Sequence, residues 1–335
     1  MQADKMATLG ILVSGILSYI VLTELELDFL LPDHIFAQQP MICRVTLSNR
    51  KWLFPSFSVT VAAKEDKEKR KKTAKAAAAK RQRILDEPVY APYIPRRSEV
   101  TQHVELTFPR RGRYTQEGFR VSSKFPFGFL RKSREVPLSR EILALPNVQP
   151  TEEFYEILPL ISGEVESFFK GRGHDLYAIR DFQEGDTARH VDWKASAKAQ
   201  HLKVREFTRE DERRVVLVFD RRLVRADEKS LAQFEKAVNF CACLAWHFYE
   251  IDAQLEFVCD GLDIAMTNAG EIVYPVLESL ALVEPELGPA DRQDDPLARV
   301  ASAARGFNII VTSQPRGSIP THLWGTSYLV FMESL

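Results

Sequence analysis

The side chains best able to do chemistry in this chain are carboxylates and one imidazole between residues 181 and 192. They are Asp181, Asp186, His190 and Asp192. Such groups act as general bases and as ligands of Mg²⁺ or Mn²⁺, so together they could support metal-dependent hydrolysis. Asp220 would add a further carboxylate. A metal-dependent hydrolase or nuclease is therefore one hypothesis for the function.

Basic side chains stand among these carboxylates in nearly equal number. They are Arg180, Arg189, Lys194 and Arg205. This balance favours a structural charge network, in which cations neutralise the acids and fix one geometry. The same segment holds Gly185, Trp193 and Glu206, and we expect Trp193 to pack it against a sheet. We therefore assign these residues a partner-binding or structural role and expect none of them to be catalytic.

Length, charge and cysteine content set further limits. A chain of 335 residues exceeds a typical single domain, which predicts two domains. Its 45 basic and 46 acidic residues give a net charge of -1, so nothing in the overall charge indicates a nucleic-acid partner. The four cysteines have no metal-ligand spacing, which predicts buried reduced thiols and no metal or other cofactor.

The run Met6–Leu22 carries no charged residue. No small-residue cleavage site follows it, and it has no polar face, so a signal peptide and an ordinary core helix fit it less well. We expect a membrane-spanning helix within residues 1–24, close to the minimum length for a bilayer. The expected location is the inner or plasma membrane, with the soluble domains in the cytoplasm.

Residues 25–146 show the alternation of apolar and polar side chains that is typical of half-buried strands. The clearest examples are Met41–Leu47, Phe57–Val61 and Val100–Phe108. We expect a small antiparallel sandwich or barrel. Residues 64–83 interrupt it with a basic segment that has strong helix propensity and no apolar stripe. A solvated helical insertion is favoured there over an arm that binds lipid or nucleic acid.

Alternating strand and helix patterns follow a proline-containing, linker-like stretch over Glu141–Leu160. The continuous apolar run Val215–Asp220 predicts a central parallel strand. The later elements are expected at Lys229–Glu250, Leu255–Cys259, Ile272–Val283, Phe307–Thr312 and Tyr328–Met332. We predict a linker and signature segment over 147–214 and a mostly parallel α/β domain over 215–335.

One long ordered pattern carries a family resemblance. Its matching residues are Gly171, Gly173, Asp175, Arg180, Gly185, Asp186, Arg189, Asp192, Trp193, Lys194, Ser196, Leu202, Arg205, Glu206 and Phe207. This pattern closely resembles the family called domain of unknown function 58. The stretches Arg110–Tyr114, Phe125–Phe129 and Leu31–Asn49 resemble further elements of that family. The likeness thus extends over nearly the whole chain outside the insertion.

The resemblance implies a membrane anchor, a β domain and a von Willebrand A-like (Rossmann-like) α/β domain without established catalysis. It also implies a partner, a MoxR-type AAA+ ATPase. The adhesion-type metal site of such domains needs Asp-x-Ser-x-Ser after the first strand. Here Asp220 is followed by Arg221 and Arg222, and both hydroxyls are missing. We therefore predict a degenerate metal site and a membrane-anchored, non-enzymatic interaction or scaffold protein.

Overall fold

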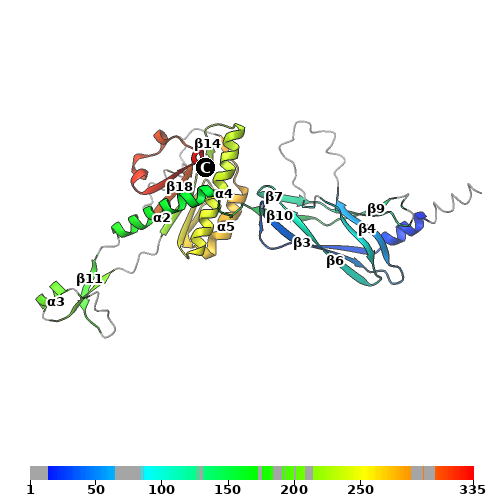
Figure 1. Cartoon of the computed structure of the whole chain (residues 1–335), viewed down its shortest axis with the longest axis horizontal. Helices are drawn as coiled ribbons and strands as arrows, with labels where there is room; N and C mark the ends of the chain where they lie inside the picture. The colour runs from blue at the N-terminus through cyan, green and yellow to red at the C-terminus, as the bar shows by residue number, and fades with distance from the viewer. Residues whose placement is uncertain are drawn as a thin grey trace, which may run out of the picture. The chain divides into compact units, whose positions relative to one another are not determined.

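The chain divides into two compact units, Met1–Leu145 and Pro146–Leu335 (Figure 1). The computed structural model describes residues 14–64, 84–85, 87–126, 128, 131–172, 176–183, 191, 193–199, 201–207, 214–287, 297 and 306–335. The predicted insertion lies outside these residues except for Lys64, whose Nζ lies 2.8 Å from the Glu135 carboxylate.

The first unit is built from strands that form two main antiparallel sheets and one smaller sheet. One main sheet has the order β1-β3-β6, the other β5-β4-β8-β9, and the smaller sheet β2-β10-β7. The strands are β1 (Leu25–Leu30), β2 (Ile35–Phe36), β3 (Pro40–Asn49), β4 (Ser56–Ala63), β5 (Val89–Ile94), β6 (Ser98–Thr107), β7 (Gly112–Gln116), β8 (Phe119–Ser123), β9 (Lys132–Val136) and β10 (Arg140–Leu145).

Alternating apolar side chains from both main sheets meet in one core. Val45 of β3 and Val59 of β4 are both buried in it. Phe29 of β1 stacks on Phe119 of β8 with ring centroids 5.3 Å apart. The unit is therefore a β-sandwich whose two layers are joined by side chains of opposite sheets.

The prediction of a membrane-spanning helix is wrong for the residues that the structure describes. Among the described residues, no helix combines the length and the apolar character needed to cross a bilayer. Residues 14–22 are helical, whereas the start of the predicted span, residues 6–13, lies outside the described part. Val21 and Leu22 are each 4% exposed and belong to the sandwich core. The last turn of this helix therefore packs onto the β unit, whereas Ile16 is 60% exposed and Tyr19 67% exposed.

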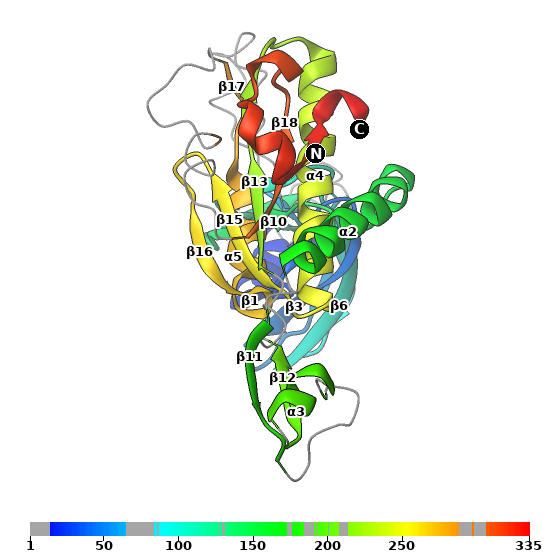
Figure 2. The same ribbon diagram turned by 90° about the vertical axis from the view of Figure 1, so that its left-hand side faces the viewer.

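The second unit contains a five-stranded sheet in the order β16-β15-β13-β18-β19 (Figure 2). All neighbouring strands in it are parallel except β16, which is antiparallel to β15. Its strands are β13 (Arg214–Phe219), β15 (Gln254–Cys259), β16 (Ile264–Asn268), β18 (Phe307–Thr312) and β19 (Ser327–Phe331). Two short strands, β14 (Arg222–Leu223) and β17 (Glu286–Leu287), pair separately.

Helices cover one face of this sheet. They are α2 (Glu152–Arg172), α4 (Glu228–Glu250) and α5 (Ala269–Leu282). Phe219 of β13 packs edge-on against Phe234 of α4, and Phe154 of α2 against Phe240 of α4. On α4, the Asp227 carboxylate caps the first turn by accepting from the Ser230 amide at 2.7 Å. The β13–α4 loop is therefore held at one end by the packing of β13 on α4 and at the other by the cap at Asp227.

The opposite face packs against short 3₁₀ turns near the end of the chain. They are η3 (Arg316–Ser318) and η4 (Thr321–Gly325), whereas η5 (Met332–Ser334) contacts α4 on the helical side. Val216 and Val218 of β13 share a buried cluster there with Ile319 and Leu323. Because adjacent strand residues point to opposite faces, β13 is buried on both sides, as its continuous apolar run indicates.

The predicted linker over Glu141–Leu160 is replaced by regular structure. Its beginning forms most of β10, and α2 starts at Glu152 and continues through Pro159. A proline removes one helical hydrogen bond, which favours a break when nothing else holds the helix. Here Ile161 is 1% exposed and Phe154 packs on α4, so tertiary contacts stabilise a helix that the local sequence does not predict.

The four cysteines are free and buried, which confirms the expectation of reduced core thiols. Burial raises the pKa of Cys43, Cys243 and Cys259 to about 12, because the thiolate is poorly solvated there. Burial raises the pKa of Cys241 still further. These thiols therefore remain protonated and chemically inert at neutral pH.

Candidate functional site

The signature segment forms a small hairpin with a short helix. Its elements are β11 (Leu176–Asp181), α3 (Trp193–Ala199) and β12 (Lys203–Phe207). Of the predicted residues, β11 carries Arg180, α3 carries Trp193 and Lys194, and β12 carries Arg205 and Glu206. Gly185, Asp186, Arg189, His190 and Asp192 lie outside the described residues. The predicted acidic cluster can therefore be followed only at Asp181.

Asp181 is neutralised across the hairpin. Its carboxylate lies 2.7 Å from Lys203 Nζ and 2.7 Å from His201 Nε2. The hydrogen bond from Lys203 is the largest cause of a lowered Asp181 pKa. The antiparallel register pairs Asp181 with Lys203, which explains the contact. Sequence reasoning named neither partner, because it paired charges by proximity in the chain and not across strands.

A serine closes the helix onto the hairpin. The amide of Lys203 donates to Ser196 Oγ at 2.8 Å, and Ser196 is 8% exposed. Trp193, at the start of the same helix, is 69% exposed. The expectation that Trp193 packs the segment onto a sheet is therefore wrong. The buried contact of this helix is made by a small polar side chain, and the indole faces away.

Replacing Trp193 with alanine is expected to leave the free energy of unfolding within about 0.5 kcal/mol of wild type, because an exposed side chain loses little on truncation. Ser196→Ala is the matched variant, and it should cost about 1 kcal/mol through the lost hydrogen bond. Urea denaturation of both variants tests this difference. A large loss of stability for Trp193→Ala would show that the indole is packed after all.

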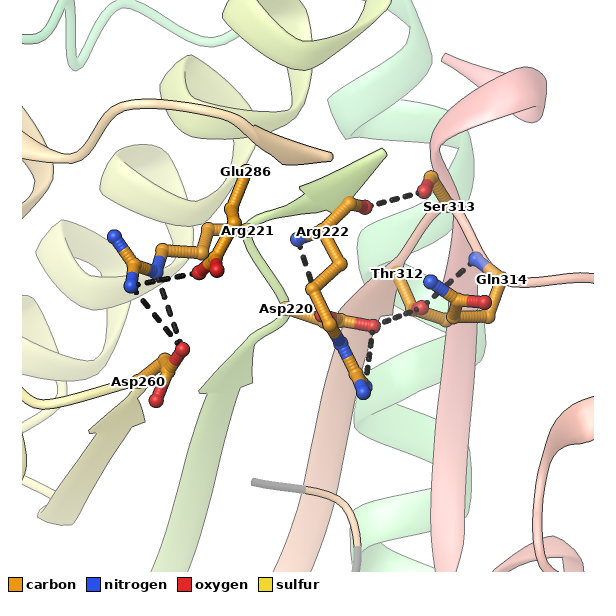
Figure 3. A network of polar contacts seen from close by, with 8 residues as sticks. All are labelled: Asp220, Arg221, Arg222, Asp260, Glu286, Thr312, Ser313 and Gln314. Atoms are coloured by element: carbon orange, nitrogen blue, oxygen red, sulfur yellow. Dashed lines mark hydrogen bonds and ion pairs between the residues drawn. The ribbon is translucent and has the colours of Figure 1, made fainter. Parts of the chain in front are cut away.

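Asp220 lies at the carboxyl end of β13 and is completely buried (Figure 3). The Arg222 guanidinium binds both of its oxygens, with Nε–Oδ1 at 2.7 Å and Nη2–Oδ2 at 3.1 Å. Thr312 Oγ1, at the end of β18, donates to Oδ2 at 2.8 Å. This is a bidentate ion pair, the strongest arrangement of hydrogen bonds between an arginine and a carboxylate. Asp220 therefore joins the ends of the two central strands.

The neighbouring Arg221 points away from Asp220. Its guanidinium lies 3.2 Å from the Asp260 carboxylate and 2.9 Å from that of Glu286 (Figure 3). The sequence predicts two cations beside Asp220, and the structure places one there. Arg222 is held at Asp220 by its backbone amide as well, which donates to Oδ1 at 3.2 Å, whereas the Arg221 guanidinium is engaged by Asp260 and Glu286.

The contacts of Asp220 leave no oxygen free for a metal ion at this degenerate metal-site position. A metal ligand needs a free carboxylate oxygen, and both oxygens of Asp220 are engaged by Arg222. In the described part of the chain, no three His, Cys, Asp or Glu side chains gather closely enough to hold an ion. Asp220 thus stabilises the carboxyl ends of the two central strands. It contributes no open ligand to the hypothetical hydrolytic cluster.

A cavity of about 1270 Å³ opens at the carboxyl ends of these strands. Counted along the chain, the five strands lie in the order 3-2-1-4-5, so the topology reverses between β13 and β18. Ligands of open α/β sheets bind outside the carboxyl ends of the strands at such a switch point. The end of β18 supplies Thr312 to the lining, the short strand β14 after β13 supplies Leu223, and the start of α4 supplies Lys229. Sequence reasoning missed this cavity.

Comparison with known proteins gives one family and no individual relative. No curated protein matches the chain. The family model described as "Protein of unknown function DUF58" matches residues 178–279. That stretch runs from β11 into α5 and includes the hairpin, Asp220 and Arg222. The resemblance found in the signature segment is thereby confirmed over residues 178–279, which match the model of the DUF58 family.

Proposed function

We propose that this chain is a non-enzymatic interaction or scaffold protein that works with a MoxR-type AAA+ ATPase in the assembly or maturation of a larger complex. The observation that supports it best is the state of Asp220, whose two oxygens are taken by Arg222 in a fully buried pair. A side chain held in this way stabilises a surface and does not serve as a base or a metal ligand. The ATPase partnership rests on the family resemblance.

The hairpin of the signature segment is the surface we assign to the partner. Among its described residues, three apolar side chains are exposed, with Phe182 at 36%, Trp193 at 69% and Leu202 at 45%. Exposed aromatic side chains are common centres of binding energy in protein interfaces. The four reduced thiols favour a reducing compartment, so we place both units in the cytoplasm with the ATPase.

Capture of a purified MoxR-type ATPase from the same organism tests the partnership. The immobilised full-length chain should retain the ATPase, and Trp193→Ala should weaken binding by about tenfold or more, as expected of an interface tryptophan. Tyr155→Ala, which removes an aromatic side chain that is 64% exposed on α2, is the matched control and should bind as wild type. Failure of the wild-type chain to bind the ATPase would contradict the proposal.

A metal titration separates this proposal from the metal-dependent hydrolase. An ion that binds only the folded chain raises its thermal midpoint as its concentration passes the dissociation constant. We expect no saturable shift with Mg²⁺ or Mn²⁺ up to millimolar concentration. A saturable shift that Asp186→Asn or Asp220→Asn removes would support the hydrolase instead. An equal shift in both variants and in wild type would indicate binding elsewhere.

A further inference from the structure

The outer strand β19 has an open edge that borders the cavity. In the described part of the chain β19 pairs only with β18. Leu329 belongs to the cluster on the 3₁₀ side of the sheet, whereas Tyr328 points to the opposite face. Both residues line the cavity. A cavity that touches side chains from both faces of a strand must run along its edge, where backbone N–H and C=O groups are available.

Two side-chain donors lie in the segment that follows β18, and within the described residues no acceptor is found for the first of them, Gln314 Nε2. Gln314 is 6% exposed, and its Nε2 has no hydrogen-bond partner among the described residues. The nearby Thr312 hydroxyl is already engaged, since it donates to Asp220 and accepts from the Gln314 amide at 3.0 Å. Arg316 lines the same cavity. Its guanidinium lies 5.3 Å from the Phe331 ring centroid, an arrangement that holds it without neutralising its charge.

We propose that this cavity binds an extended, acidic segment of a partner polypeptide, which adds a strand to the edge of β19. Its backbone pairs with β19, and one carboxylate accepts hydrogen bonds from Gln314 Nε2 and the Arg316 guanidinium. Backbone pairing supplies affinity in this mode of recognition, and side-chain pockets supply specificity. The inference rests on the proposed interaction function and adds the chemistry of a ligand to it.

The charges of the lining place the carboxylate at one end of the cavity. Glu164 and Glu333 are part of the lining, so an acidic segment is not favoured everywhere along it. Asp227 also lines the cavity, but its carboxylate is used to cap α4. Arg316 follows Gln314 in the same loop, and an unpaired buried donor beside a cation is best satisfied by an anionic acceptor. The Gln314–Arg316 end is therefore the acidic subsite.

A displayed library of random peptides about ten residues long, near the upper length of natural strands, tests this on the immobilised full-length chain. Wild type should enrich peptides with alternating β-branched residues that carry Asp or Glu. Arg316→Glu should exchange the acidic preference for a basic one, since the charge of the subsite is reversed. Arg214→Glu reverses an exposed arginine at the opposite end of β13 and should enrich the same peptides as wild type.

The best peptide is then measured by fluorescence anisotropy. Gln314→Leu should weaken binding by about tenfold, the value of one charge-assisted hydrogen bond. Backbone N-methylation at alternate positions should also weaken it by about tenfold or more, because donors of the added strand are lost. An N-methylated peptide that binds equally well overturns the added strand. Enrichment that Arg316→Glu leaves unchanged overturns the acidic subsite.

The two proposals can fail separately. If the ATPase is captured by wild type while the library gives no acidic strand-like peptides, the inference about β19 is wrong and the interaction function stands. If the library selects the expected peptides but no ATPase binds, the cavity is a peptide site and the named partner is wrong. If the library yields no enriched peptides and the ATPase is not captured, both proposals are wrong.

Discussion

Replacing Arg222 with methionine is expected to lower the free energy of unfolding of the second unit by about 3–5 kcal/mol. The reason is that the Asp220 carboxylate is 0% exposed and would lose the guanidinium that compensates it. Removing one member of a buried ion pair is far more costly than the pair is stabilising, because the remaining charge has lost its hydration. Among the described residues, the Thr312 hydroxyl and the backbone amide of residue 222 would still donate to it.

Arg221→Met is the matched control for this prediction. Arg221 forms ion pairs with Asp260 and Glu286, but its side chain is 31% exposed and each carboxylate 27% exposed. Water screens such pairs, so the control should cost only about 1 kcal/mol. Asp220→Asn added to Arg222→Met should recover part of the loss, because the buried group is then neutral.

Urea denaturation, monitored by hydrogen exchange at the β13 and β18 amides, measures these differences in the second unit. The two units can unfold at different urea concentrations, so a single global midpoint would mix them. Equal costs for Arg222→Met and Arg221→Met would show that the buried pair has no special role. No recovery in the double variant would show that the loss comes from packing and not from charge.

Replacing Lys51 with methionine is expected to destabilise the first unit by about 2–3 kcal/mol at neutral pH. Lys51 is 5% exposed, and its Nζ donates to Val21 O at 2.8 Å, to Thr23 O at 3.1 Å and to Ser56 Oγ at 2.6 Å. These bonds tie the end of the N-terminal helix to the start of β4. Methionine matches the length of the side chain but leaves the two carbonyl groups without this donor.

The same lysine predicts a pH dependence with a definite sign. Burial lowers the pKa of Lys51 from 10.5 to about 8, and the charge of Glu24 opposes this shift in part. Between pH 8 and 10.5 the unfolded chain therefore holds a proton at Lys51 that the folded chain has released. Stability rises with pH wherever the unfolded state binds more protons. The contribution is absent below pH 8 and complete above pH 10.5.

Urea denaturation of wild type and Lys51→Met across this pH window measures the effect as a difference between the two chains. The advantage of wild type should grow as the pH rises from 8 to 10.5. Lys64→Met, which removes a lysine whose side chain is 38% exposed, is the control for the loss of a lysine side chain as such. A constant gap between wild type and Lys51→Met would contradict the lowered pKa.

The sequence by itself determined the elements whose pattern is continuous and strong. The apolar run ending at Asp220 predicted a central parallel strand, and β13 lies between β15 and β18 in parallel pairing. The periodicity of Lys229–Glu250 predicted a helix, and α4 spans Glu228–Glu250. These predictions succeed because burial on one face or on both leaves a local period in the chain. The ordered signature pattern likewise identified the family without any structure.

Tertiary structure decided what local patterns leave open. An apolar run such as Met6–Leu22 looks the same whether it enters a bilayer or a protein core, and only the packing of Val21 and Leu22 on the sandwich distinguishes them. Helix α2 replaces the expected linker because contacts on α4 outweigh the cost of Pro159. Both outcomes depend on partners that are distant in the sequence.

The candidate site shows the same division. The sequence marked Asp220 as a position without its metal-binding hydroxyls, but it could not tell which arginine would bind the carboxylate. In the fold, Arg221 is engaged by Asp260 and Glu286, and Arg222 binds Asp220. The cavity is assembled from α2, the β13–α4 loop and the segment after β18, which meet only in the fold. Residue types are local properties of a sequence, whereas register and the meeting of distant loops are set by the free energy of packing the whole unit.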